Sequence, residues 1–241
     1  MFSINSTLDD SGHELPDFPS RTDSLLSSLD ISPKKVASII ASLDPSKATG
    51  PDGIPVIVLQ KCSPELSPIL SKLYKKCVLE SCFPSCWKLA SVIPAYKNSG
   101  ERSDPRNYRP ISLLSVISKV FECLICSPLV RHLDFHNLFS DSQYGFRAGR
   151  STADVLTVIS DRVYRALNIC GEGRAIALDI SKAFDKVWHT GLLHKLKAYG
   201  VSGHILAIIR SFLSNRLIRV VLDGQSSVDY PINSGVPKAL S

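Results

Sequence analysis

The spacing of apolar and polar residues along the chain predicts mainly amphipathic helices. In six stretches apolar residues recur at three- and four-residue intervals, so that each stretch has one apolar face. Ser32 followed by Pro33 is typical of a helix start, and so is Ser151 ahead of the fourth stretch. We expect helices over residues 33–44, 64–82, 115–138, 152–168, 186–200 and 202–213. The apolar face of the 152–168 helix is expected to pack on a core.

Four shorter stretches have the composition of strands. Residues 175–180 form an apolar run with β-branched residues, which predicts a buried strand. Asp223-Gly224 predicts a hairpin turn, and Pro94 predicts an edge position or a bulge because proline cannot donate to a ladder. The expected strands are residues 87–96, 175–180, 216–222 and 226–232. Together with the helices they predict an α+β fold.

A single carboxylate, Asp179, interrupts the apolar run of residues 175–180. An ionised Asp is costly to bury unless a cation or hydrogen-bond donors meet it, so this position suggests a site. The alternative is structural, with Asp179 capping the next helix and Phe184 belonging to the core. The residue pattern by itself leaves both interpretations open.

The composition indicates a globular protein with a mildly basic surface. The 241 residues are 44% hydrophobic, and a net charge of +6 favours a polyanionic partner. No apolar run approaches the roughly 20 residues of a membrane span, so no membrane partner is expected. Seven cysteines, an odd number without a signal peptide, predict reduced thiols and an intracellular location in nucleus or cytoplasm, not secretion.

The first thirty residues differ in composition from the rest of the chain. They are rich in Ser, Asp and Pro and contain few apolar clusters, which predicts a disordered or loosely packed lead-in over residues 1–30. The remaining residues, 31–241, are expected to form one domain.

Two loops concentrate basic residues beside aromatic and small ones. Lys97 and three arginines lie within the thirteen positions from 97 to 109, and arginine forms bidentate hydrogen bonds with phosphate oxygens. Residues 140–152 place two glycines and two arginines before a helix start, which suits close contact with a nucleic-acid backbone. The alternatives are a solvated surface loop in the first case and a simple turn, with Ser151 as N-cap, in the second.

Metal-binding side chains also gather on the predicted 115–138 helix, at Cys123, Cys126, His132 and His136. Only five residues separate the two pairs, far fewer than the ~12 of a zinc finger. On a helix, cysteines three residues apart are more simply small core residues, and we favour that interpretation.

Residues 178–185, Leu-Asp-Ile-Ser-Lys-Ala-Phe-Asp, resemble motif A of reverse transcriptases in the form found in non-LTR (LINE, jockey-like) retrotransposons. Four more strings resemble motifs of this family in the family's order: Lys-Ala-Thr-Gly-Pro-Asp-Gly-Ile-Pro at 47–55, Asn-Tyr-Arg-Pro-Ile-Ser-Leu-Leu at 107–114, Gln-Tyr-Gly-Phe-Arg-Ala-Gly-Arg-Ser-Thr at 143–152 and Asn-Ser-Gly-Val-Pro at 233–237. Together the five strings favour metal ligation by Asp179 over a capping role.

The resemblance implies the fingers and part of the palm of a right-hand polymerase, with helices packed on an incomplete antiparallel sheet. The implied reaction is RNA-directed DNA synthesis from a primer 3′-hydroxyl, with Mg²⁺, dNTPs, an RNA template and primer DNA. Asp179 would be the catalytic carboxylate and Mg²⁺ ligand. Phe184, Lys97 and Arg109 would bind the nucleotide, Phe184 as the gate against a ribose 2′-hydroxyl. The residues implied to bind nucleic acid are Gln143, Tyr144, Arg147 and Arg150.

The chain also departs from the family pattern. Lys238 and Ala239 stand where the family has Gln and Gly, and no Ala-Asp-Asp or Tyr-x-Asp-Asp hairpin (motif C) and no thumb follow. The resemblance therefore predicts truncation within motif B and only one side of a two-metal site, and hence an inactive chain. The alternative is a nucleic-acid-binding remnant without catalysis, and a third interpretation is a truncated product without a biochemical role.

Overall fold

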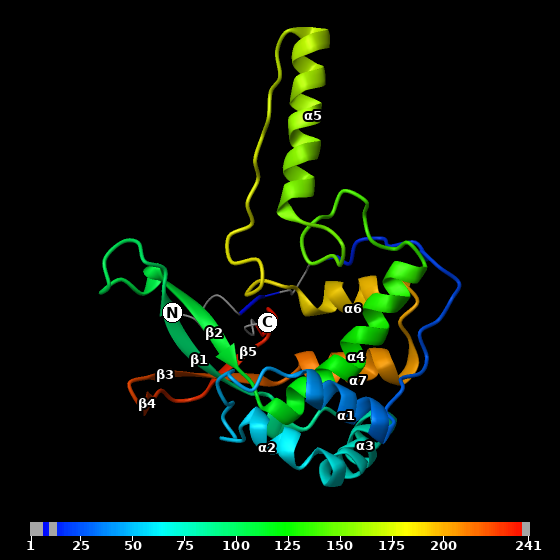
Figure 1. The fold of residues 1–241 in the computed structure, drawn as a ribbon, viewed down its shortest axis with the longest axis vertical. Coiled ribbons are helices and arrows are strands. Elements are labelled where there is room, and N and C mark those ends of the chain that lie inside the picture. Colours follow the sequence, from blue (N-terminus) through cyan, green and yellow to red (C-terminus); the bar gives the residue numbers. More distant parts are fainter. Residues whose placement is uncertain (1–6, 10–13, 238–241) are drawn as a thin grey trace. The chain divides into compact units, whose positions relative to one another are not determined.

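A computed structural model describes residues 7–9 and 14–237 of the chain. The chain divides into two compact units. The smaller unit is formed by residues 133–181, and the larger unit by the residues up to 132 and from 182 onward. Among the described residues there are seven α-helices and a five-stranded sheet, which confirms the α+β prediction (Figure 1).

The larger unit contains most of the helices. They are α1 (Pro33–Ser42), α2 (Val56–Lys61), α3 (Ser63–Leu79), α6 (His189–Ala198), α7 (Gly203–Leu213) and α4 (Val116–Phe135), whose last turn belongs to the smaller unit. The start of α1 is as predicted, because the Ser32 side chain accepts a hydrogen bond from the Lys35 backbone N–H and Pro33 follows at the first helical position. Only α2 was not predicted, since six residues are too few to show a helical period.

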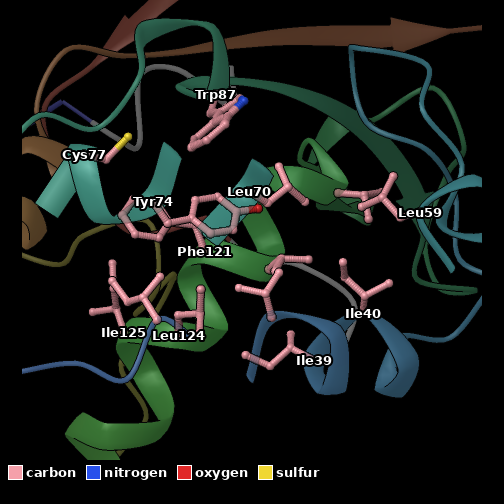
Figure 2. Packing of buried hydrophobic residues seen from close by; sticks show 14 of the residues in the cluster. Ile39, Ile40, Leu59, Leu70, Tyr74, Cys77, Trp87, Phe121, Leu124 and Ile125 are labelled. Atoms are coloured by element: carbon pink, nitrogen blue, oxygen red, sulfur yellow. The ribbon is translucent and has the colours of Figure 1, made fainter. Parts of the chain in front are cut away.

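An aromatic cluster between α3 and α4 forms the centre of the core in the larger unit (Figure 2). The rings of Tyr74 and Phe121 stack with centroids 4.9 Å apart, and Trp87 meets Tyr74 edge-on at 6.0 Å. Tyr74 is fully buried, and its hydroxyl donates to the carbonyl of Ile117 at 2.8 Å, which satisfies its polar end. Aliphatic residues of α1 and α2, such as Ile40 and Leu59, complete this core.

The sheet is mixed, and this corrects the prediction of an antiparallel one. Its strands are β1 (Leu89–Tyr96), β2 (Tyr108–Leu113), β3 (Arg216–Leu222), β4 (Gln225–Ser226) and β5 (Tyr230–Ile232). Strand β1 pairs antiparallel with β2 but parallel with β3, which pairs antiparallel with β4 and β5. Several helices separate β1 from β3, so no hairpin fixes their relative direction, and a parallel pair needs such a long crossover.

Pro94 lies where β1 has a neighbour on one side only. The β1–β3 pairing covers Leu89 to Val92, whereas the β1–β2 pairing continues to Tyr96, with Pro94 opposite Pro110. A proline at this point leaves no ladder donor missing. The observed position agrees with the edge position expected from the sequence.

The predicted lead-in is anchored to α6 in its described part. The backbone N–H of Arg21 donates to Ala198 O at 2.9 Å, and Leu26 forms a bridge with Val201. Gly200 has φ +83°, and a Cβ there would lie 2.2 Å from the Ser24 carbonyl oxygen, so only glycine permits this close approach. Residues 1–6 and 10–13 of the predicted lead-in lie outside the described residues.

The smaller unit consists mainly of helix α5 (Thr152–Cys170) and the segments that flank it. The predicted cap is confirmed, because the Ser151 hydroxyl and the Asp154 carboxylate form a reciprocal capping box. The helix ends at Gly171 in a left-handed conformation. Residues 172–181 then run back from that end of the helix (Figure 1).

Two predictions about burial in the smaller unit are wrong. Residues 175–180 form no ladder with any described residue and are exposed, Leu178 to 91%. An isolated strand cannot satisfy its backbone groups in the interior, so it stays in water. The apolar face of α5 is likewise exposed at Leu156 and Ile159, 57% and 51%, instead of packing on a core.

Candidate nucleotide and nucleic-acid site

The β1–β2 ribbon brings together the two cations predicted to bind a triphosphate. Arg109 lies on β2 opposite Ala95, and Lys97 follows the end of β1, two positions beyond Ala95. Because alternate residues of a strand share a face, Lys97 and Arg109 lie diagonally on one face of the ribbon. Both residues are exposed, and the Lys97 ammonium donates to Arg106 O at 2.7 Å. Their charges therefore face solvent, where an anion can reach them.

The end of this ribbon carries aromatic and basic side chains together. Tyr96 and Tyr108 pack with centroids 5.4 Å apart, and the Arg102 guanidinium lies 5.2 Å from the centroid of Tyr96. Arg106 forms an ion pair with Asp104 at 2.8 Å, which lowers the pKa of that carboxyl through hydrogen bonds. The Asp104 carboxylate thus neutralises Arg106, whereas Arg109 is exposed on the strand itself.

A turn containing Phe184 is held against the segment that precedes Lys238. The backbone N–H of Val236 donates to Phe184 O, and that of Gly235 to Val187 O, both at 2.9 Å. The His189 ring contacts Gly235 O through Nε2 at 2.6 Å. Gly235 has φ +81°, and a Cβ there would lie 2.7 Å from the Asp185 carbonyl oxygen. Backbone contacts therefore join residues 184–187 to residues 235–236, with glycine required at the junction.

A small cavity of about 40 Å³ lies beside this junction, and a buried arginine contributes to its wall. Arg216 is 1% exposed, donates through Nη1 to Phe212 O at 3.1 Å and lies over the Phe212 ring. Its Nη2 has no hydrogen-bond partner among the described residues. Burial lowers the pKa of Arg216, and the charge of Glu122 acts in the opposite direction. The cavity also adjoins Pro110 and Asp185, the neighbours of Arg109 and Phe184.

The loop of residues 139–150 in the smaller unit, called the 139–150 loop below, folds its two arginines inward. Arg147 forms an ion pair with Asp134 at 3.2 Å, and its guanidinium lies 4.5 Å from the centroid of Phe139. Arg150 pairs with Asp141 at 3.5 Å and lies over Tyr144 at 5.1 Å. Intramolecular carboxylates and rings therefore hold both guanidinium groups.

The other predicted nucleic-acid residues of this loop have local contacts. The Gln143 side-chain amide donates to Gly145 O at 3.1 Å, and Gln143 is exposed. Tyr144 is half-buried beneath Arg150. Gln143 thus lies at the surface of the loop, whereas the Tyr144 ring packs under the Arg150 guanidinium within it.

Asp179 lies in the smaller unit, in the exposed segment after α5. Within residues 7–9 and 14–237, no group of three His, Cys, Asp or Glu side chains is arranged to hold a metal ion. A divalent metal needs several oxygen ligands, so the described carboxylates do not by themselves fit the Mg²⁺ that the sequence resemblance implies. The assignment of Asp179 as a metal ligand therefore rests on its sequence context, because the described residues form no metal site around it.

Sequence reasoning did not single out several residues of the site. Asp134 and His189 act through partners that are distant in the sequence, whereas Arg216 donates to Phe212, four residues before it. Asp134 had a signal, because an acidic residue in the last turn of a helix opposes the helix dipole and so calls for a partner. Arg216 had none, because nothing in the sequence indicates that this arginine is buried, and His189 had none, because its partner depends on the Gly235 turn.

Comparison of the sequence with known protein families shows the class to which the protein belongs. A family model described as reverse transcriptase (RNA-dependent DNA polymerase) matches residues 96–238, more than half of the chain. The match includes the β1–β2 ribbon from Tyr96, the 139–150 loop and the Phe184 turn. The chain belongs to the reverse transcriptase family.

Proteins of transposons and mobile elements are among those to which the chain is similar. The chain is 31% identical over 205 residues to the RNA-directed DNA polymerase from mobile element jockey of Drosophila melanogaster, a match over 85% of this chain and 22% of the relative. It is 30% identical to the probable RNA-directed DNA polymerase from transposon BS and 31% identical to that from the X-element of the same fly, with 88% and 86% of this chain covered and 24% and 23% of those relatives. The chain therefore spans about a quarter of the length of these relatives.

No described helix has the length and apolarity that a membrane span requires.

Proposed function

We propose that this chain supplies the fingers and the first part of the palm of an RNA-directed DNA polymerase of retrotransposon origin. The observation that carries the proposal is the β1–β2 ribbon, which holds Lys97 and Arg109 on one face. Pro110 and Asp185, the neighbours of Arg109 and Phe184, line one cavity. Cations beside a nucleotide gate fit the binding of a dNTP, whose phosphates need charge neutralisation.

The remaining partners follow from the family and from the basic loops. We assign the RNA template and primer DNA to the 139–150 loop with Gln143, Tyr144, Arg147 and Arg150, and the Mg²⁺ of the family to Asp179. Residues 31–241 would form the polymerase portion, behind a lead-in over residues 1–30. The protein would act inside the cell, in nucleus or cytoplasm.

The 241-residue polypeptide by itself is proposed to be catalytically inactive. Two-metal phosphoryl transfer needs carboxylates from two elements of the chain, and Asp179 is the only carboxylate here at a position that matches a metal ligand of the family. Purified protein with an RNA template, an annealed DNA primer, dNTPs and Mg²⁺ should give no primer extension above background. Robust extension that Asp179→Ala abolishes would contradict this proposal, and extension unaffected by that change would indicate a contaminating polymerase.

A nucleic-acid-binding remnant without catalysis is the second candidate function. Its support is the exposed charge of the β1–β2 ribbon combined with the single matching carboxylate. The protein should bind a labelled RNA–DNA hybrid with an affinity that falls as salt rises, since phosphate contacts release counterions. Removing Arg109, Arg147 and Arg150 together should weaken binding at least tenfold and reduce the salt dependence. An affinity that is unchanged after the loss of all three arginines would exclude this function.

A further inference from the structure

Two adjoining cavities lie along α6 and α7, which pack on each other in the larger unit (Figure 1). Their volumes are about 410 and 420 Å³, within the size range of ligand pockets, and they share three lining residues. On each helix the lining residues recur every four positions, so they lie in one row along its surface. The rows are His189, Leu193 and Lys197 on α6 and Leu206, Arg210 and Ser214 on α7 and its C-cap. We call the two cavities together the α6–α7 groove.

The cavity of about 420 Å³ combines apolar walls with two cations. Leu193 and Leu206 are half-buried, and Lys197 and Arg210 are exposed. Among the described residues, neither cation has an ion-pair partner or a side-chain hydrogen-bond partner. An aliphatic side chain would be removed from water against the leucines, and a carboxylate beside it would meet the cations. This cavity therefore suits a ligand that is apolar and acidic at once.

The other cavity already holds a peptide backbone. The side-chain amide of Asn233 accepts a hydrogen bond from the N–H of Leu8 at 2.8 Å and donates to Leu8 O at 3.0 Å. Two bonds to the backbone of one residue reproduce the pairing between antiparallel strands. They read no side chain, so Asn233 can hold an extended chain of any sequence.

The lead-in reaches both cavities and has the complementary chemistry. Leu8 lines one cavity and Leu15, which is 45% exposed, lines the other. Residues 9–17 include four carboxylates and no Lys or Arg. Farther along, the N–H of Arg21 donates to Ala198 O, so the described lead-in continues beside α6. An acidic segment with leucines is therefore attached to a groove with cations and apolar walls, and it leaves the wider cavity open.

We propose that the α6–α7 groove is a docking site for an acidic, leucine-containing peptide segment of a partner protein, and that the lead-in is a tethered competitor for it. A leucine of the partner would pack on Leu193 and Leu206, its carboxylates would meet Lys197 and Arg210, and Asn233 would hold its backbone. A tethered segment competes at an effective concentration set by its linker. The inference does not depend on the proposed polymerase function.

A peptide fits this groove better than a nucleic acid does. Proteins bind nucleic acids through phosphate contacts and through aromatic rings on which bases stack. The cavity that contains the two cations has leucine walls and no Phe, Tyr or Trp among its described lining residues. The paired bonds of Asn233 match the N–H and C=O that each residue of a peptide offers.

Fluorescence anisotropy with the full chain and a labelled synthetic peptide of the sequence of residues 7–17 tests the proposal. Replacing both Leu8 and Leu15 of the chain by Ser should tighten peptide binding several-fold, because it weakens the tethered competitor. In that variant, Lys197→Glu and Arg210→Glu should each weaken binding about tenfold, and the affinity should fall as salt rises. A lead-in that served only to stabilise the fold would create no affinity for the free peptide when it is loosened.

Lys72→Glu in the same Ser-substituted variant is the matched control, because Lys72 is an exposed lysine of α3 outside the groove. It should leave peptide binding unchanged. No peptide binding at low salt by the Ser-substituted variant, or equal weakening by Lys72→Glu and Lys197→Glu, would overturn the proposal. Displacement of the labelled peptide by single-stranded RNA as readily as by unlabelled peptide would also overturn it, in favour of a polyanion site.

Discussion

Glu122 and Arg216 are two ionisable residues of the larger unit, of which Arg216 is fully buried and Glu122 is partly exposed at the surface. Desolvation raises the pKa of the Glu122 carboxyl, against the opposing effects of a 2.6 Å hydrogen bond from Ser118 and of the charge of Arg216. The folded protein therefore holds a proton on Glu122 at a pH where the unfolded chain has lost it. Stability tied to this group is complete below the ordinary value of about 4.5 and decreases as the pH rises through the raised pKa.

Glu122→Gln should remove this loss of stability. Gln is uncharged and still offers a carbonyl oxygen to Ser118, so the variant should be more stable than the wild type at neutral pH, by about 1.4 kcal/mol for each unit by which the pKa is raised. The measurement is the free energy of unfolding in urea between pH 4 and pH 8. Glu80→Gln, on the exposed end of α3 beside Lys76, is the control and should change little. An unchanged pH dependence in Glu122→Gln would contradict the assignment.

At the scale of elements, the 139–150 loop depends on the end of α4, because Asp134 supplies the carboxylate that holds Arg147. This carboxylate carries a negative charge and also holds Arg147 in position. The two effects predict opposite changes in nucleic-acid affinity when the carboxylate is removed. Loss of a negative charge near a polyanion should tighten binding, whereas loss of a positioning contact should weaken it.

Asp134→Asn should weaken several-fold the binding of a labelled RNA–DNA hybrid that has a single-stranded RNA overhang, and it should have no further effect once Arg147 is already Ala. Asp161→Asn is the charge-matched control, because Asp161 pairs with Arg165 on the surface of α5, within the same unit. That variant should bind as the wild type does or slightly more tightly. Tighter binding by Asp134→Asn would show instead that Asp134 competes with the nucleic acid for Arg147.

Elements whose stability is local could be predicted from the sequence, and elements that depend on distant partners could not. Caps at Ser32 and Ser151 and the Asp223-Gly224 turn lie where the residue pattern placed them, because neighbouring residues supply their partners. Strand β2 was missed, because Pro110 interrupts its pattern and pairing with β1 compensates. The apolar run of residues 175–180 was overvalued, because hydrophobicity signals burial without indicating what would cover the run.

At the scale of the whole molecule, the predicted site residues are divided between the two compact units. Lys97, Arg109 and Phe184 belong to the larger unit, whereas Asp179 and the 139–150 loop belong to the smaller one. The sequence order of the motifs indicated the family, and the match to the reverse transcriptase family over residues 96–238 agrees with it. Motif order carries no information on ion pairs such as Arg147–Asp134, which is why the inward turn of the arginines could not be foreseen.

The hydrogen bond between His189 and Gly235 has a consequence for the chemistry of that imidazole. A carbonyl oxygen can only accept, so Nε2 of His189 must carry the proton in the 2.6 Å contact. The neutral ring is thereby fixed as one tautomer, with its lone pair on Nδ1. While the contact lasts, Nε2 can neither ligate a cation nor act as a base, and His189 serves only as a hydrogen-bond donor at that edge.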